Sequence, residues 1–127
     1  MTPARLLPLL RRASLLLALA GGVYLFVRFD GRQLPPDSLS PLLRFNPGDH
    51  LVVDRYPGGL GLSDAVLFAG PDGRVHLAEV RKLRAREGRR EYWLGHDASG
   101  SPAPDSERLG WIDEDWIRAR VIMVWPW

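Results

Sequence analysis

The chain of 127 residues is long enough for one domain with a modest core and too short for a second large domain. Lysine and arginine number 17 against 15 aspartate and glutamate residues, and the formal net charge of +2 is too small an excess to indicate a nucleic-acid partner. The sequence contains no cysteine, which excludes disulfides, thiolate zinc sites and a cysteine nucleophile.

An apolar run near the N-terminus predicts a membrane helix. It extends from Ala13 to Val27 and is flanked by Arg12 and Arg28. A helix needs about 20 apolar residues to span a bilayer, so the run is slightly short. Phe29 extends it, and the flanking arginines can snorkel to the headgroups. We therefore expect an N-terminal membrane anchor over residues 1–29.

A cleavable signal peptide is the alternative to this anchor. Ala18-Leu19-Ala20 followed by Gly21 has the small-x-small form of a cleavage site. The apolar residues nevertheless continue beyond that site, from Val23 to Val27. This continuation favours an uncleaved anchor.

The charges around the apolar run predict its orientation. Three arginines precede the run, whereas Arg28 and Arg32 flank Asp30 after it. By the positive-inside rule the N-terminus is cytoplasmic. The sequence thus predicts a single-pass protein of the cytoplasmic membrane, with the lipid bilayer as a partner and an extracytoplasmic C-terminal domain.

The rest of the chain has the pattern of a β domain. Residues 30–41 contain paired prolines and a glycine, which predict a linker. Beyond it, short apolar segments are separated by Gly- and Pro-containing turns, which predicts an all-β or β-dominated domain over residues 42–127. The Asp72-Gly73 pair is a strong hairpin signal. The expected strands are His50–Arg55, Asp64–Ala69, Arg74–Leu83, Glu91–Leu94 and Ile117–Trp125.

A pair of serines stands shortly before a Pro-Gly-Asp turn and an apolar strand. The segment Ser38-Leu39-Ser40 precedes Pro47-Gly48-Asp49, and Ser40 lies nine residues before Asp49. This arrangement resembles the bacterial type I signal peptidases, in which a nucleophilic serine begins a Ser-Met-x-Pro-Thr-Leu stretch and Pro-Gly-Asp ends nine residues after it. The intervening residues of this chain, 41–45, lack the Met, Pro and Thr of that stretch.

The resemblance continues through nearly the whole chain. Residues 63–68 resemble the family's Gly-Asp-Val-Val-Val-Phe strand, and residues 92–97 resemble its Val-Leu-Gly-Asp-Asn segment. Residues 105–110 stand where the family has Asp-Ser-Arg-x-x-Gly, and residues 121–126 resemble its closing apolar strand and Trp-Pro. The large subdomain that many members insert is replaced by a short Arg-rich connection between Leu83 and Glu91. The resemblance implies a small signal-peptidase-like β domain behind one transmembrane helix.

The same resemblance assigns roles to particular residues. A serine hydroxyl needs a neighbouring base and donors for the oxyanion that forms on attack. By the family's pattern Ser40 is the nucleophile and Ser38 is an oxyanion donor. Asp105 and Ser101 take supporting positions. The expected chemistry requires no metal and no cofactor.

The position of the general base is open. The family uses a lysine, which can be neutral when it is buried. A gapless count puts Glu79 at that position, whereas a shifted register puts Lys82 there. Arg81 cannot serve, because a guanidinium does not lose its proton in proteins. Strand alternation predicts that Val80 and Lys82 share one side and that Glu79 and Arg81 share the other.

Histidines offer a different base and a possible metal site. His76 and His96 suggest a Ser-His arrangement, such as eukaryotic relatives of the family use, but neither stands at the base position. Together with Asp49, Asp97 and Asp105 they lack ligand-like spacing, so we expect no metal site.

The basic run over residues 81–91 is best interpreted as a solvated hairpin near anionic headgroups. A nucleic-acid patch would interleave aromatic and basic residues, and this run has no aromatic residue before Tyr92. We therefore expect no nucleic-acid partner.

Two functions remain open. The first is a membrane-anchored serine endopeptidase of signal-peptidase type, which by resemblance would cut exported precursors after small residues near the membrane. The second is a noncatalytic relative that binds an extended peptide along a strand edge or supports a membrane complex. Retention of both serines favours the first function, and Glu79 at the gapless base position favours the second. Ser38 and Ser40 beside Pro41 are also ordinary turn formers.

Overall fold

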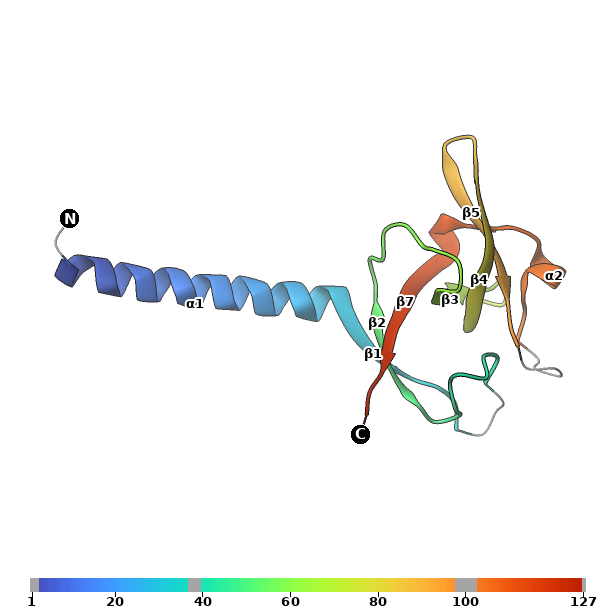
Figure 1. Cartoon of the computed structure of the whole chain (residues 1–127), viewed down its shortest axis with the longest axis horizontal. Coiled ribbons are helices and arrows are strands. Elements are labelled where there is room, and N and C mark those ends of the chain that lie inside the picture. Colours follow the sequence, from blue (N-terminus) through green and yellow to red (C-terminus); the bar gives the residue numbers. More distant parts are fainter. Residues whose placement is uncertain (1–2, 37–39, 98–102, 127) are drawn as a thin grey trace.

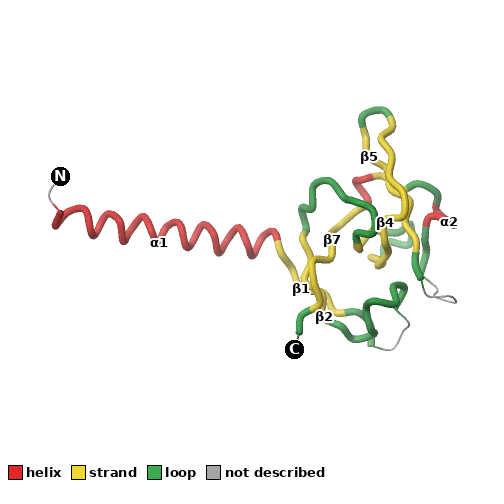
Figure 2. The backbone as a smooth tube through the Cα atoms, in the orientation of Figure 1, coloured by secondary structure: helices red, strands yellow, loops and turns green. Residues whose placement is uncertain are grey.

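The protein consists of one long N-terminal helix followed by a curled antiparallel sheet (Figures 1 and 2). A computed structural model describes residues 3–36, 40–97 and 103–126. The helices are α1 (Pro3–Arg28), α2 (Ser106–Leu109) and the 3₁₀ helix η1 (Glu114–Trp116). The strands are β1 (Phe29–Gln33), β2 (His50–Asp54), β3 (Ala65–Ala69), β4 (Val75–Arg86), β5 (Arg89–Gly95), β6 (Ile112–Asp113) and β7 (Ile117–Val124).

Helix α1 is long and apolar enough to cross a membrane. Its 26 residues extend about 39 Å at the ~1.5 Å rise of an α-helix, which exceeds the ~30 Å hydrocarbon core of a bilayer. All of its residues are described and none is buried, so the helix projects freely from the β domain (Figure 1). The expected N-terminal apolar helix is confirmed, although it begins ten residues before Ala13.

The seven strands form one sheet in the order β1-β2-β7-β3-β4-β5-β6, and every neighbouring pair is antiparallel. The last strand therefore lies inside the sheet, between β2 and β3. Asp72-Gly73 lies in the turn that joins β3 and β4, as its hairpin signal predicts. The β-dominated fold class and the five expected strands are confirmed, with ends shifted by a few residues.

The expected linker over residues 30–41 needs a correction. Its first four residues belong to β1 and pair with β2 from Asp30↔Val53 to Gln33↔His50. The stretch before Pro35 contains no proline, so its backbone donors can enter the ladder. The non-strand connection therefore begins after Gln33.

Two apolar clusters cover the two faces of β3, which explains why four of its five residues are buried. One cluster joins β3 to the inner sides of β2, β4 and β7 and to the loop after β1. The other joins its opposite face to β4, β5 and β6. The first consists of Leu34, Leu42, Phe45, Leu51, Val53, Ala65, Leu67, Leu77 and Ala119. The second consists of Leu60, Val66, Phe68, Ala78, Val80, Tyr92, Leu94 and Ile112.

Candidate functional site

The loop that begins at Ser40 is anchored by two apolar side chains. Leu42 is fully buried and Phe45 is nearly so, and both belong to the first cluster. The Ser40 hydroxyl donates a hydrogen bond to the carbonyl oxygen of Leu42 at 2.8 Å. The amide of Phe45 donates to the same carbonyl at 3.1 Å. The hydroxyl proton of Ser40 therefore contributes to the turn of its own loop.

This loop, residues 40–45, lies against Glu79 inside β4 and against the end of β5. The amide of Asp97 donates to the carbonyl of Pro41 at 2.9 Å, and the amide of Leu43 donates to the Asp97 carboxylate at 3.4 Å. Arg44 Nη1 lies 3.6 Å from Glu79 Oε2. The structure thus brings the loop of the expected nucleophile to Glu79, the residue that the gapless register gives as the base position.

Glu79 belongs to an ion network. Its side chain is 13% exposed and lies between Arg44 and Arg81, whose Nε is 3.8 Å from Glu79 Oε1. Arg81 Nη2 also binds Asp97 Oδ1 at 2.5 Å. The hydrogen bond from Arg81, with a further contribution from the amide of Leu43, lowers the pKa of the Asp97 carboxyl despite its desolvation. The network ties the Ser40 loop to both strands.

Lys82 follows Arg81 in β4 but lies over Trp93 of the neighbouring strand. It is exposed, and its Nζ lies 5.8 Å from the centre of the Trp93 ring. A bulge interrupts the register of β4 and β5 between Val80 and Lys82, which pair with the consecutive residues Leu94 and Trp93. The expectation that Val80 and Lys82 share one side is therefore wrong, because the bulge at Arg81 reverses the alternation.

A cavity of about 520 Å³ adjoins Ser40. Its walls come from the segment after β1, from Ser40 and Pro41, and from the turn and first residues of β4. Its lining also includes Asp72 and His76, and His76 Nε2 lies 3.0 Å from Asp72 Oδ2. The His76 ring packs beside Phe68 of the second cluster, with the ring centres 5.8 Å apart. Hydrogen bonds from the amide of Arg74 and from His76 lower the pKa of the Asp72 carboxyl. Ser40, Asp72 and His76 are thus among the residues that line one cavity.

Beside this cavity, part of β4 lacks a strand partner on its β5 side among the described residues. Residues 75–79 pair with β3 on one side, but β5 pairs with β4 only from Glu79 onward. In the described part of the chain, no strand pairs with residues 75–78 on the β5 side. Val75 and Leu77 line the cavity from this edge. Such an edge offers unpaired backbone groups to an incoming strand.

Asp105, expected in a supporting position, caps α2 and binds a histidine. Its carboxylate accepts a hydrogen bond from the amide of Glu107 at 3.1 Å and lies 3.2 Å from His96 Nε2. Nδ1 of His96 is buried and has no hydrogen-bond partner among the described residues. Ser106, the next residue, accepts a bond from the amide of Leu94 at 2.7 Å. Asp105 therefore fixes α2 against the end of β5.

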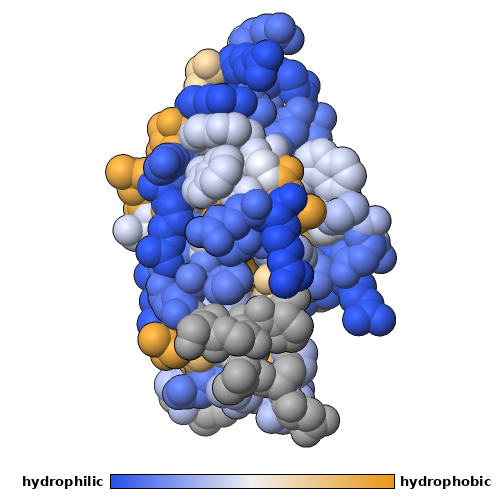
Figure 3. All heavy atoms as spheres, turned by 90° about the vertical axis from the view of Figure 1, so that its right-hand side faces the viewer, coloured by the Kyte–Doolittle hydropathy of each residue, from blue (hydrophilic) through white to orange (hydrophobic). Residues whose placement is uncertain are grey.

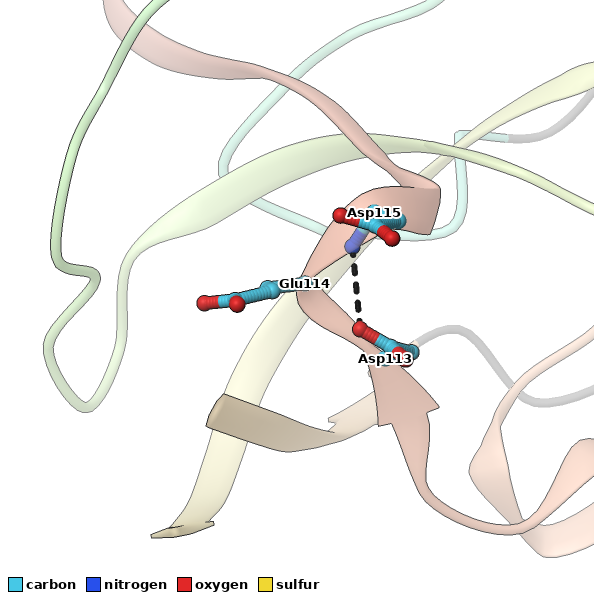
Figure 4. A group of neighbouring side chains, drawn as sticks. All are labelled: Asp113, Glu114 and Asp115. Atoms are coloured by element: carbon cyan, nitrogen blue, oxygen red, sulfur yellow. Dashed lines mark hydrogen bonds between the residues drawn. The ribbon is translucent and has the colours of Figure 1, made fainter. Parts of the chain in front are cut away.

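The turn from β6 into η1 carries three acidic residues that sequence reasoning did not single out (Figure 4). Ligand atoms of Asp113, Glu114 and Asp115 lie within 4.8 Å of one another. Arg89 binds Asp113 at 2.8 Å and Asp115 at 2.5 Å, and it lowers the pKa of the Asp113 carboxyl. Asp113 also caps η1 by accepting a bond from the amide of Asp115. The group is therefore a helix cap in which Arg89 pairs with two of the three carboxylates.

Two of the expected site residues, Ser38 and Ser101, lie outside the described residues. Comparison of the chain with family models, with curated proteins and with solved structures gives no match.

Proposed function

We propose that the protein is a membrane-anchored domain of signal-peptidase type that binds an extended peptide in the cavity beside Ser40. The observation that carries this proposal is the open edge of β4 along the cavity. An added strand would gain backbone hydrogen bonds from that edge, while its alternate side chains would enter the cavity. Leu34, Leu51 and Leu77 give the cavity apolar walls, which suit small apolar side chains.

Ladder geometry identifies the backbone groups available to the peptide. The amide of Gly70 donates to the carbonyl of Arg74, which makes these two residues a hydrogen-bonded pair. In an antiparallel ladder such pairs alternate, so His76 and Ala78 direct their backbone groups to β3. Val75 and Leu77 then direct theirs to the open edge.

Val75→Pro tests this mode of binding. Val75 is 47% exposed, so its replacement spares the core, and proline removes only a donor at the open edge. We expect the affinity of the full chain in detergent micelles for a fluorescent peptide of signal-peptide type, ending in small residues, to fall about fivefold, as loss of one hydrogen bond of about 1 kcal/mol predicts. Val75→Thr, which keeps the donor, is the matched control. Equal affinity of both variants would contradict strand addition at this edge.

Hydrolysis of the bound peptide is the second candidate function, and it is supported by the presence of Ser40, Asp72 and His76 among the residues that line one cavity. It requires the His76 ring to turn from Phe68 toward Ser40 when the peptide binds. In this scheme the Ser40 hydroxyl leaves its bond to Leu42, gives its proton to the imidazole and attacks the carbonyl carbon of the peptide, whose C=O π bond opens to an oxyanion. Collapse of the oxyanion breaks the C–N bond, and the imidazolium gives its proton to the leaving amine. Water then hydrolyses the ester on Ser40 and restores the hydroxyl. Asp72 orients and stabilises the imidazolium. Ser38 as oxyanion donor stays a prediction.

Cleavage of a precursor with small residues before the cut, followed by mass spectrometry, separates the possible bases. We expect Ser40→Ala and His76→Gln to remove turnover and Lys82→Met to leave it unchanged, because Lys82 lies over Trp93. Loss of turnover in Lys82→Met alone would instead assign the base to Lys82. Glu79→Lys tests the gapless register by placing an amine at that position. Unchanged cleavage by Ser40→Ala would exclude Ser40 as the nucleophile.

A further inference from the structure

The membrane helix joins the sheet without a linker. Arg28 is the last residue of α1, and Phe29 is the first residue of β1. The carbonyl of Arg28 accepts a hydrogen bond from the amide of Arg55 at 2.8 Å. Its guanidinium binds the carboxylate of Asp54 through Nε at 3.1 Å and through Nη2 at 3.0 Å.

Asp54 is the only charged residue among the fully buried side chains of the described chain. Besides the bonds from Nε and Nη2 of Arg28, its carboxylate accepts one from the amide of Tyr56 at 2.9 Å, and Arg120 Nη2 lies 3.9 Å from Oδ2. A bidentate guanidinium–carboxylate pair fixes direction as well as distance. The end of α1 is therefore held by β2 through its side chain and its backbone.

The boundary of the membrane can be placed relative to this junction. The apolar run of α1 ends at Val27, so the hydrocarbon region ends close to Arg28 and the adjoining ends of β1 and β2 lie at headgroup level. The C-terminal end of the chain lies on the same side of the domain as α1 (Figure 1). The opposite face is mainly hydrophilic (Figure 3).

Apolar side chains are exposed where β7 runs beside β2. Ile122, Met123 and Trp125 are 45–47% exposed, and the amide of Trp125 donates to the carbonyl of His50 at the start of β2. Tryptophan is enriched at membrane interfaces, where its ring contacts the acyl boundary and its N–H stays hydrated. A lipid surface adjoining the end of α1 is the partner that suits these side chains.

We propose that the Arg28–Asp54 pair fixes the β domain on the bilayer, with the Ile122–Trp125 end of β7 in contact with the headgroup region. Both residues are positioning residues. Because no flexible segment separates α1 from β1, the length of α1 sets the height of the domain above the membrane. This inference does not depend on what binds beside Ser40.

Quenching of tryptophan fluorescence by brominated lipids tests the contact. The full chain is placed in nanodiscs that contain lipids brominated near the headgroup, and every variant carries Trp127→Phe. We expect Trp125→Phe to remove at least half of the quenching. Trp93→Phe, which alters a ring packed 5.4 Å from that of Trp111, should leave it nearly unchanged. Equal quenching with and without Trp125 would overturn the proposal.

Two changes at the junction test its rigidity. Arg28→Gln removes the guanidinium, whereas a four-residue Gly-Ser insertion between Val27 and Arg28 keeps the pair with Asp54 and frees the helix. We expect each change to reduce quenching of Trp125 at least twofold. The insertion keeps the proposal testable if Arg28→Gln fails to fold, and the near-ultraviolet circular dichroism of the tryptophans reports folding. Unchanged quenching in a folded insertion variant would show that the junction does not position the domain.

Discussion

Arg44 Nη1 lies 3.6 Å from Glu79 Oε2, which links the loop of Ser40 to the strand position where the signal-peptidase resemblance expects a lysine. A lysine there would face two guanidinium groups, because Arg81 lies on the other side of Glu79. The acidic residue therefore agrees with the charges around it. Position 79 therefore carries glutamate where the gapless register of the resemblance has lysine, and Arg44 and Arg81 supply the positive charges that pair with it.

Glu79→Gln should weaken the attachment of the Ser40 loop. The change removes the negative charge that pairs with Arg44 and Arg81 at a site only 13% exposed. We expect the free energy of unfolding to fall by about 1 kcal/mol, the upper end for partly exposed ion pairs. Urea unfolding of the full chain in detergent micelles measures this change in the free energy of unfolding. Glu114→Gln is the matched control, and an equal loss in both variants would contradict a role for the network.

Gly95→Ala should displace Arg81. A Cβ at position 95 would lie 2.9 Å from Cγ and 3.1 Å from Nε of that side chain, closer than van der Waals contact allows. Arg81 would then move away from Asp97 and Glu79. We expect a loss of about 1–2 kcal/mol in the free energy of unfolding, within the range for overpacking. Gly31→Ala, where a Cβ meets nothing within 4 Å, is the control and should leave stability nearly unchanged.

Local patterns predicted the strands well because each has an apolar alternation or run with a turn on either side. β3 is an example, since its continuous apolar residues correspond to burial on both faces. β1 escaped prediction because Asp30, Gly31 and Arg32 have low strand propensity, and only pairing with β2 makes them a strand. Element order in the sheet, with β7 between β2 and β3, depends on contacts between distant segments.

The candidate site was less predictable for a physical reason. A bulge of one residue at Arg81 changes which side chains share a face, and such a shift leaves no mark in the alternation of residue types. The presence of Ser40 and His76 in the lining of one cavity depends on how the loop folds back on β4, and the pairing of Arg28 with Asp54 spans 26 positions. The spacing of residues in the sequence singled out most of these residues, but it could not predict which of them lie close together in the fold.

Ser106→Ala should destabilise the end of β5. The Ser106 hydroxyl is buried and accepts the amide proton of Leu94 at 2.7 Å. Alanine would leave this buried N–H without its partner, at a cost of about 1–3 kcal/mol in the free energy of unfolding. Ser63→Ala, at an exposed serine, is the control and should change stability by less than about 0.5 kcal/mol. Similar losses in the two variants would contradict this use of the Ser106 hydroxyl.

Stability should fall in acid, and Asp54 should account for part of the loss. Burial opposes ionisation of Asp54, but the hydrogen bonds from Arg28 and Tyr56 and the charges of Arg28 and Arg120 outweigh it, so the pKa of its carboxyl is lowered. The pKa values of Asp97 and Asp113 are also lowered, chiefly by hydrogen bonds from Arg81 and Arg89. A lowered folded-state pKa means that the unfolded chain binds protons first as the pH falls.

The stabilisation from these carboxylates is therefore complete above the unfolded-state value of about 3.9 and is lost as the pH falls through the lower folded-state values. Urea unfolding of the full chain in detergent micelles between pH 7 and pH 2 measures this loss. Asp54→Asn should be less stable than the parent at pH 7, because the buried pair with Arg28 is gone, and the difference should shrink toward pH 2. A difference that stays constant over this range would mean that ionisation of Asp54 does not contribute to holding α1 on the sheet.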